Sequence, residues 1–239
     1  MEEREMKLEE AIILAGGMGT RLKGVISDMP KPLAPINGIP FLTYLIKFLK
    51  QEGIKHIVLS VGYRWEMIKE IYGESFEGIK ISYAVEEEPL GTGGGIALAL
   101  RKTTHDDILI LNGDSFIDFD LKSFYSLHKK ENASLSFVLK EMNDFERYGS
   151  VEVEENKIIE FKEKKYIDKG LINAGAYIGK RNIFEGLDLP DKFSFEQDYL
   201  EKKVGEGLFF GFKTEGYFID IGIPQDYKKA EIDFKEIWK

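Results

Sequence analysis

The sequence contains no cysteine and only three histidines among its 239 residues. The absence of cysteine excludes disulfides, thiolate metal ligands and a cysteine nucleophile, and it is compatible with a reducing cytoplasm. His56, His105 and His128 are scattered along the chain, so a histidine metal site is not expected either. Basic residues are outnumbered as well, and the net charge of −9 argues against the basic face that nucleic-acid binding requires.

Long hydrophobic runs are also absent. No apolar stretch approaches the roughly 20 residues of a membrane-spanning helix, and the charged start MEEREMK lacks the apolar segment of a signal peptide. We therefore expect a soluble protein. With 43% hydrophobic and 13% aromatic residues the chain can form one substantial core, and a single α/β domain is the simplest organisation.

Short apolar runs alternate with helical patterns in the first half of the chain. Strands are expected at residues 10–14, 56–61, 79–85 and 108–111, and helices at 41–49, 66–72, 93–101 and 120–130. This alternation predicts a doubly wound, mostly parallel sheet that binds ligands at the carboxyl ends of its strands. The second half is expected to be more antiparallel, with strands at 134–139, 149–153, 157–161, 171–178, 208–214 and 217–221, and helices at 196–204 and 224–238.

The stretch at residues 14–22, LAGGMGTRL, directly follows the first expected strand. Glycines at such a turn let the backbone approach a phosphate, so that successive N–H groups surround the anion. The spacing matches neither the dinucleotide-binding GxGxxG nor a Walker A loop, and an ordinary glycine-rich turn remains the alternative. Lys31, between Pro30 and Pro32, adds a second cation to Arg21 and favours a triphosphate site.

These residues resemble the N-terminal signature of the sugar-phosphate nucleotidyltransferases, GGxGxR followed by PKP, although KGVIS at residues 23–27 replaces the usual Pro-Leu-Thr. These enzymes join a nucleoside triphosphate to a sugar 1-phosphate and release pyrophosphate. The resemblance covers about residues 10–227. It implies a Rossmann-like nucleotide-diphospho-sugar transferase fold, with one domain over residues 8–239. The nucleotide-binding part would span about 8–115, and a smaller antiparallel sugar-binding part about 116–239.

The resemblance also implies the residues of the nucleotide site. Arg21 and Lys31 correspond to the catalytic cations of the family. The nucleotide is expected to contact Leu14, Ala15, Gly16, Gly17, Gly19, Thr20, Glu86, Pro89, Gly91 and Thr92.

The run EEEPLGTGGG at residues 86–95 is the second motif. It could be an acidic loop before a glycine-rich helix start, but in the family this position recognises the nucleobase, and Glu86 corresponds to the recognising side chain. A carboxylate only accepts hydrogen bonds. Guanine offers it two adjacent donors, N1–H and the 2-amino group, whereas uracil and thymine offer only N3–H. We therefore expect GTP in preference to UTP or dTTP.

Two aspartates resemble the metal ligands of the family. Asp114 ends the run LNGD after an apolar strand, where it could alternatively cap the next helix, and Asp220 lies in YFIDIG. Two carboxylates without histidine or cysteine nearby suit a hard ion, so Mg²⁺ is the expected cofactor. Asp118 and Asp120 are weaker candidates for the same role.

Three further elements resemble the sugar side of the family. Arg147-Tyr148-Gly149 matches an RYG element, from which Tyr148 and Gly149 are expected in the site. In FKEK, Glu163 would bind sugar hydroxyls and Lys164 the sugar phosphate, although Lys165 replaces the usual proline and the run could be a solvated strand end. Asn173 and Gly175 of NAGAY are expected to contact the sugar.

The short chain and the EEEPLGTGGG run most resemble bacterial guanylyltransferases that act on D-glycero-α-D-manno-heptose 1-phosphate. Enzymes for mannose 1-phosphate, and a uridylyltransferase for N-acetylmuramic acid 1-phosphate, remain open. A regulatory subunit that only binds a sugar nucleotide is disfavoured because Arg21, Lys31, Asp114 and Asp220 are all present. The expected partners are small-molecule substrates, not nucleic acid or membrane. A homo-oligomer is possible, since Phe234 and Trp238 could serve a dimer contact or the core.

Overall fold

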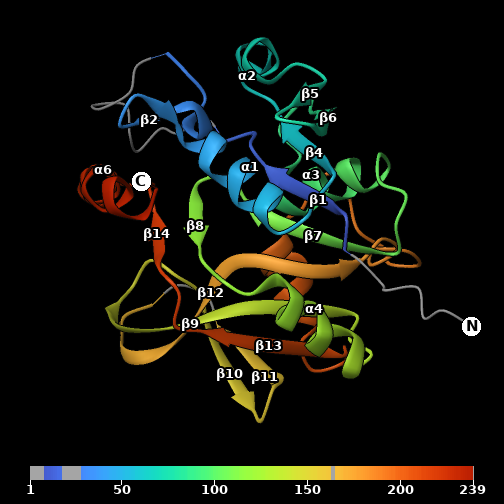
Figure 1. Cartoon of the computed structure of the whole chain (residues 1–239). Coiled ribbons are helices and arrows are strands. Elements are labelled where there is room, and N and C mark those ends of the chain that lie inside the picture. Colours follow the sequence, from blue (N-terminus) through green and yellow to red (C-terminus); the bar gives the residue numbers. More distant parts are fainter. Residues whose placement is uncertain (1–7, 18–27, 163–164, 239) are drawn as a thin grey trace, which may run out of the picture.

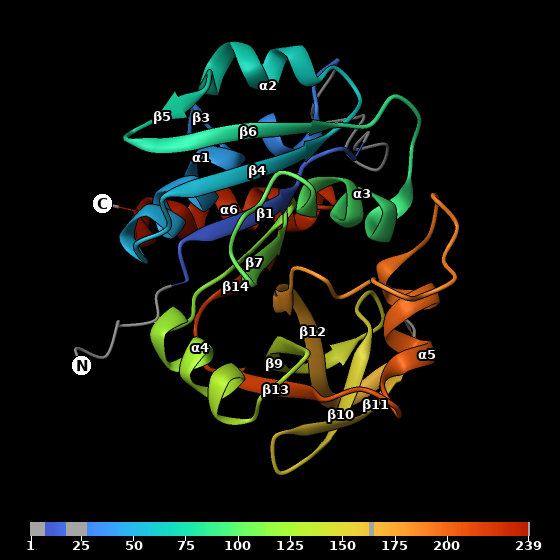
Figure 2. The ribbon, with the colours of Figure 1, turned by 90° about the vertical axis from the view of Figure 1, so that its right-hand side faces the viewer.

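The computed structural model describes residues 8–17, 28–162 and 165–238. In these ranges the chain forms a ten-stranded mixed sheet that carries helices on both faces (Figures 1 and 2). Successive side chains of a strand point to opposite faces. Ile12 therefore packs into one hydrophobic cluster, while Ala11 and Ile13 pack into the other. The predicted doubly wound α/β architecture is confirmed.

The first half of the sheet consists of β1 (Glu10–Leu14), β4 (His56–Val61), β5 (Ser75–Phe76), β6 (Ile79–Val85) and β7 (Asp107–Asn112). These strands lie in the order β7, β1, β4, β6, β5, and all pairs are parallel except the edge pair of β6 with β5. The carboxyl ends of β1, β4, β6 and β7 consequently lie at one edge of the sheet. Residues 15–17 of the glycine-rich stretch, Glu86 and Asn112 all lie at that edge.

The helices are distributed over both faces of the sheet. Buried side chains of α1 (Phe41–Gln51), α2 (Trp65–Tyr72), α4 (Leu121–Lys130) and α6 (Pro224–Ile237) belong to one cluster. Those of α3 (Gly91–Leu100) and the π-helix η3 (Phe195–Leu200) belong to the other. No helix in the described ranges is both long enough and apolar enough to cross a membrane.

The second half continues the same sheet. It contains β9 (Leu135–Phe145), β10 (Ser150–Glu154), β11 (Lys157–Lys162), β12 (Ile167–Lys180) and β13 (Phe209–Thr214). β12 is antiparallel to both β7 and β9, and the order continues through β13 and β11 to β10. Because β10 also pairs with β12, these five strands close on themselves. β12 therefore joins the parallel half to a closed antiparallel part, which contains the single parallel pair β13–β9.

Shorter elements complete the fold. β2 (Pro35–Ile36) and β3 (Ile39–Pro40) form a hairpin, and β8 (Ser115–Ile117) pairs antiparallel with β14 (Phe218–Asp220). The 3₁₀ turn η2 spans Lys31–Leu33. The helix expected at 196–204 is instead the π-helix η3 followed by the short α5 (Glu201–Lys203). α6 begins with Pro224 at its first position, as predicted.

Candidate active site

The glycine-rich stretch leaves β1 at the carboxyl edge of the parallel strands. Leu14 ends β1 beside Ser60 of β4, and the Ala15 N–H donates to the Ser60 carbonyl at 2.7 Å. Gly17 then lines a cavity. The predicted residues Gly19, Thr20 and Arg21 lie outside the described residues, so their roles stay predictions.

The carboxylate of Glu86 lies against this stretch. Its Oε1 accepts a hydrogen bond from Ser60 Oγ at 3.1 Å, and its Oε2 accepts one from the Leu90 N–H at 2.9 Å. A Cβ at Gly16 would lie 3.1 Å from Oε1, and one at Gly95 would lie 3.0 Å from it, so both glycines leave room for the carboxylate. A carboxylate oxygen has two lone pairs. Glu86 therefore keeps one acceptor position on each oxygen.

The residues after the acidic loop pack closely against the segment at residues 193–196. Gly91 has a φ of +74°, and a Cβ there would lie 2.6 Å from the Phe193 carbonyl oxygen. Thr92 Oγ1 donates to Glu196 Oε2 at 2.7 Å and accepts from the Phe195 N–H at 2.8 Å. The start of α3 thus holds the distant segment at 193–196. Pro89, also predicted for the nucleotide site, is exposed.

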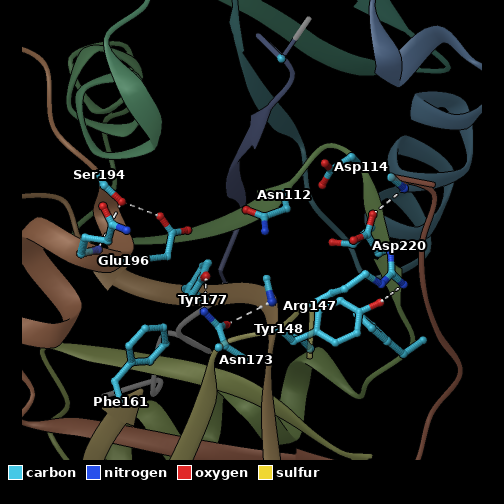
Figure 3. A pocket seen from close by; sticks show the side chains of 18 of the residues that line it. Asn112, Asp114, Arg147, Tyr148, Phe161, Asn173, Tyr177, Ser194, Glu196 and Asp220 are labelled. Atoms are coloured by element: carbon cyan, nitrogen blue, oxygen red, sulfur yellow. Dashed lines mark hydrogen bonds between the residues drawn. The ribbon is translucent and has the colours of Figure 1, made fainter. Parts of the chain in front are cut away.

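Asp114 and Asp220 are brought together by the pairing of β8 with β14. Asp220 lies opposite Ser115 in this pair, and the Ile221 N–H donates to the Asp114 carbonyl at 3.0 Å. The two aspartates are 106 positions apart in the sequence, but both face the same cavity (Figure 3). The structure therefore places the two predicted metal ligands at one site.

Lys31 places a positive charge beside these two aspartates, which we call the acidic pair. Its Nζ donates to Asp114 Oδ2 at 2.6 Å and lies 3.7 Å from Asp220 Oδ1. Its side chain is only 11% exposed, and its backbone lies in the η2 turn, with Pro30 before it and Pro32 after it. Burial, and then the charge of Asp114, raise the pKa of Asp220, while Lys31 opposes this change. The pair can therefore accommodate more positive charge than one ammonium supplies.

The donor set fits a divalent cation such as Mg²⁺. Both side chains offer carboxylate oxygens, which Mg²⁺ prefers. Among the residues that the structure describes, no group of three or more histidine, aspartate or glutamate side chains is placed to hold a metal. Protein ligands alone would leave the coordination incomplete, and Mg²⁺ commonly completes it with water and substrate phosphate oxygens.

Arg147 and Tyr148, both from the RYG element expected on the sugar side, lie next to the acidic pair in the cavity (Figure 3). The Arg147 guanidinium lies 5.4 Å from the Tyr148 ring centroid and pairs with Asp226 on α6. Burial, and then the charge of Asp220, raise the pKa of Tyr148, so its hydroxyl stays protonated and can donate a hydrogen bond. Glu163 and Lys164, the other residues predicted for this side, lie outside the described residues.

Asn173 and Gly175 are positioned by an irregularity in β12. The register with β9 shifts between Asn173 and Tyr177, where β12 changes partner from β10 to β7. Gly175 has a φ of +77°, and a Cβ there would lie 2.5 Å from Asn112 Nδ2. Asn173 Nδ2 donates to the Tyr177 hydroxyl at 2.8 Å. Such bulges often adjust side chains next to active sites, and this one turns Asn173 into the cavity.

The cavity has a volume of about 650 Å³ and gathers residues from both halves of the sheet. Eight predicted site residues line it: Gly17, Lys31, Asp114, Tyr148, Gly149, Asn173, Gly175 and Asp220. Leu14, Ala15, Gly16, Glu86, Pro89, Gly91 and Thr92 do not line it, although Gly16 adjoins Glu86 and Thr92 contacts a lining residue.

Several lining residues were missed in the sequence. Asn112, Arg147 and Phe161 belong to the LNGD, RYG and FKEK motifs, so these motifs carried a signal for them. Ser194, Glu196 and Gln197 had no comparable signal beyond a helix start. Ser194 caps η3 by accepting from the Gln197 N–H at 3.2 Å. This polar segment forms the end of the cavity opposite the acidic pair (Figure 3).

Comparison with known proteins gives concordant matches. Residues 10–236 match the family described as "Nucleotidyl transferase". The D-glycero-alpha-D-manno-heptose 1-phosphate guanylyltransferase of Aneurinibacillus thermoaerophilus is 50% identical over 222 residues, which cover 93% of this chain and 96% of that protein. The protein of the same description from Campylobacter jejuni is 46% identical over 223 residues, with 91% and 96% covered.

A solved structure agrees with these matches. The crystal structure of HddC from Yersinia pseudotuberculosis complexed with GMP-PN superimposes with a TM-score of 0.83 at 39% identity. The alignment covers 95% of this chain and 99% of that one.

Proposed function

The chain belongs to the nucleotidyl transferase family, and on that premise we propose that it transfers GMP from GTP to a sugar 1-phosphate. The proposed sugar is D-glycero-α-D-manno-heptose 1-phosphate, and the products are GDP-heptose and pyrophosphate. The heptose 1-phosphate guanylyltransferases that match almost the whole chain support this choice. Within the structure, the proposal depends on Lys31 between Asp114 and Asp220 at one end of a cavity of substrate size.

In the proposed reaction an oxygen of the sugar 1-phosphate attacks the α-phosphorus of GTP. The new O–P bond forms in line with the bond to the β-phosphate, which breaks as pyrophosphate leaves. No protein nucleophile takes part, so the chain accelerates the reaction by positioning the substrates and neutralising their charge. Asp114 and Asp220 would hold Mg²⁺, which when bound supplies positive charge to the phosphate oxygens.

The cations of the chain have separate proposed roles. Lys31 is already fixed at the acidic pair, and its ammonium would neutralise charge on the α-phosphate during attack. Arg21 and the amides of residues 16–20 would hold the leaving β- and γ-phosphates. Lys164 would hold the attacking phosphate. The short spacing from Gly17, which lines the cavity, to Arg21 supports the second role.

Glu86 is proposed to select guanine. Each of its carboxylate oxygens accepts one described hydrogen bond and keeps one acceptor position. Two acceptor positions on one carboxylate match the adjacent N1–H and 2-amino donors of guanine. Adenine and cytosine each have an unprotonated ring nitrogen in place of the guanine N1–H, so they cannot satisfy both positions.

The test is a grid of reactions with Mg²⁺, in which pyrophosphate release is measured for GTP, UTP, dTTP, CTP and ATP with four sugar 1-phosphates. The sugars are the heptose, mannose, glucose and N-acetylmuramic acid. We expect the highest kcat/KM with GTP and the heptose 1-phosphate. A preference for mannose would contradict the proposed sugar, and a preference for UTP would contradict the role of Glu86. Inactivity across the grid would indicate a subunit that only binds sugar nucleotides.

Glu86→Gln tests base selection in the same assay. The amide replaces one acceptor by a donor, which opposes a guanine donor, so the GTP-to-UTP ratio of kcat/KM should fall about tenfold or more. The kcat with GTP at saturation should change less. Glu87→Gln is the matched control, because its exposed neighbouring carboxylate should leave the ratio unchanged. An unchanged ratio for Glu86→Gln would contradict the assignment.

A further inference from the structure

The two ends of the cavity differ in charge and in hydrogen-bonding character. The described cations that line it are Lys31 and Arg147, and both lie with Asp114 and Asp220 at one end. The other end carries Ser194, Glu196 and Gln197 (Figure 3). A sugar 1-phosphate is divided in a complementary way. It has an anionic phosphate at C1, which suits the end with the cations, and only hydroxyls farther away.

Glu196 presents a hydrogen-bond acceptor at the end of the cavity that also carries Ser194 and Gln197. Its Oε2 accepts from Thr92 Oγ1 at 2.7 Å and from Ser194 Oγ at 3.2 Å. Its Oε1 has no donor among the described residues, and the half-buried side chain points into the cavity (Figure 3). A partly buried carboxylate oxygen that lacks a protein donor is suited to accept from a ligand.

The position of this carboxylate is well fixed. The Phe195 N–H donates to Thr92 Oγ1 at 2.8 Å, and the Gly93 N–H donates to the Phe193 carbonyl at 3.0 Å. A Cβ at Gly93 would lie 2.1 Å from the Phe193 ring, so α3 and this segment are in intimate contact. Glu196 also lies in a π-helical turn, a rare conformation that often occurs at functional sites. Its carboxylate is therefore oriented before any ligand binds.

The surroundings of Glu196 favour a hydroxyl donor over a phosphate. A carboxylate repels an anionic phosphate but accepts readily from an O–H group. In the same cavity, Asn173 donates to the hydroxyl of Tyr177. Burial, and then the charge of Glu196, raise the pKa of Tyr177, so this phenol stays neutral. Glu196 thus lines the same cavity as the residues proposed to contact the sugar ring.

We propose that Glu196 recognises the exocyclic C6–C7 hydroxyls of the heptose, with Ser194 and Gln197 beside it. This inference rests on the proposed function, because it takes the phosphate of the heptose 1-phosphate to lie at the acidic pair. The exocyclic chain is the part of the sugar that extends farthest from C1. Mannose carries one exocyclic hydroxyl and no C7, so Glu196 distinguishes the heptose from mannose.

The test compares Glu196→Gln with the wild-type chain at saturating GTP and Mg²⁺, with heptose 1-phosphate and mannose 1-phosphate each varied. The amide keeps the size of the side chain but removes its charge. We expect KM for the heptose 1-phosphate to rise about tenfold or more, and the heptose-to-mannose ratio of kcat/KM to fall by a similar factor. The KM for GTP should stay within about twofold. Glu196→Asp keeps the carboxylate and should retain part of the selectivity.

Asp198→Asn is the matched control. Asp198 lies in the same π-helix and accepts from the Ser194 N–H and from Lys202, but it does not line the cavity. Its variant should leave the selectivity unchanged. If Asp198→Asn reproduced the loss, the effect would come from the fold of the segment, and the inference would be overturned.

Other results would also overturn it. An altered KM for GTP alone would place Glu196 at the nucleotide, and equal losses with both sugars would place it at a hydroxyl that they share. Unchanged selectivity in an active enzyme would refute the inference while the proposed function stood. A wild-type chain that makes no product from GTP and either sugar would refute the proposed function and, with it, this inference.

Discussion

Two sets of carboxylates in this molecule have opposite surroundings. Glu10 and Asp107 are each saturated with hydrogen-bond donors, whereas Asp114 and Asp220 face each other across one lysine. All four come from the ends of sheet strands or from the loops that follow them. The environment of a carboxylate therefore indicates whether it stabilises the fold or is available to bind a ligand.

Glu10, at the start of β1, connects three segments of the chain. It accepts from the backbone N–H groups of Thr104 and His105 at 2.7 and 2.8 Å and contacts His56 Nδ1 at 2.8 Å. Burial alone would raise its pKa, but the N–H of His105, the His56 side chain and the N–H of Thr104 lower it to about 2. Its charge is therefore stabilised in the folded protein.

Asp107, at the start of β7, is saturated in the same way. Lys180, Tyr125 and Lys129 donate to it at 2.7, 2.9 and 3.0 Å, and His128 Nε2 lies 3.5 Å away. Burial opposes ionisation, but these donors hold the pKa of Asp107 well below its usual range. Asp220 shows the reverse, because burial and the neighbouring Asp114 raise its pKa. Among the described residues, Asp114 accepts a hydrogen bond from Lys31 and Asp220 accepts one from the Gly222 N–H, so both carboxylates keep acceptor positions for a cation and a substrate.

The largest effect is expected from removing one member of the acidic pair. Asp220→Asn should lower kcat about a thousandfold, since charge supplied to the phosphates contributes several kcal/mol to the rate. The free energy of unfolding should change by less than about 1 kcal/mol, because the substitution also removes repulsion from Asp114. Asp118→Asn is the control, since Asp118 is near Asp114 in sequence but does not line the cavity. Turnover within tenfold of wild type would refute the assignment.

Removing a carboxylate that is saturated with donors should have the opposite effect, because it should lower the stability of the fold and leave kcat unchanged. Asp107→Asn leaves Lys129 and Lys180 without their buried counter-charge, so we expect the free energy of unfolding to fall by about 4 kcal/mol. Urea denaturation measures this change. The kcat at temperatures where the variant is folded should match wild type. A stable variant with low kcat would show that Asp107 has a chemical role.

The lowered pKa of Glu10 predicts that the stability of the fold depends on pH. Its pKa is about 2 in the folded protein and about 4.5 in the unfolded chain, so the unfolded state binds its proton first as the pH falls. The shift contributes about 3 kcal/mol above pH 4.5, and this contribution is lost as the pH falls towards 2. Glu10→Gln should remove that part of the dependence in urea titrations at a series of pH values. An identical profile for the variant would refute this account.

Much of the parallel half was predictable because its strands are short buried apolar runs between turns. β4 and β6 begin and end at the expected residues. β9 and β12 are longer than expected because their ends are partly exposed and polar, which removes the hydrophobic signal. The predicted helix after residue 194 was correct in position but not in type, because composition does not distinguish a π-helical turn from an α-helical one.

The candidate site, like the fold, was predictable only in part. The resemblance predicted Asp114 and Asp220, but no spacing rule could show that the β8–β14 pair joins them. Ser194 and Glu196 were missed because their importance depends on contact with Thr92, about 100 residues earlier. Local sequence patterns do not encode such contacts. Motif resemblance supplies only those that the motif already contains.

The unbroken sheet through β12 also limits how the enzyme can move. Residues 176–180 of β12 pair with β7, and residues 171–172 of the same strand pair with β10. A hinge rotation that separated the two halves would have to break a buried ladder of main-chain hydrogen bonds. We therefore expect substrates to enter and products to leave through motions of loops and side chains at the rim, while the two halves of the sheet stay together as one body.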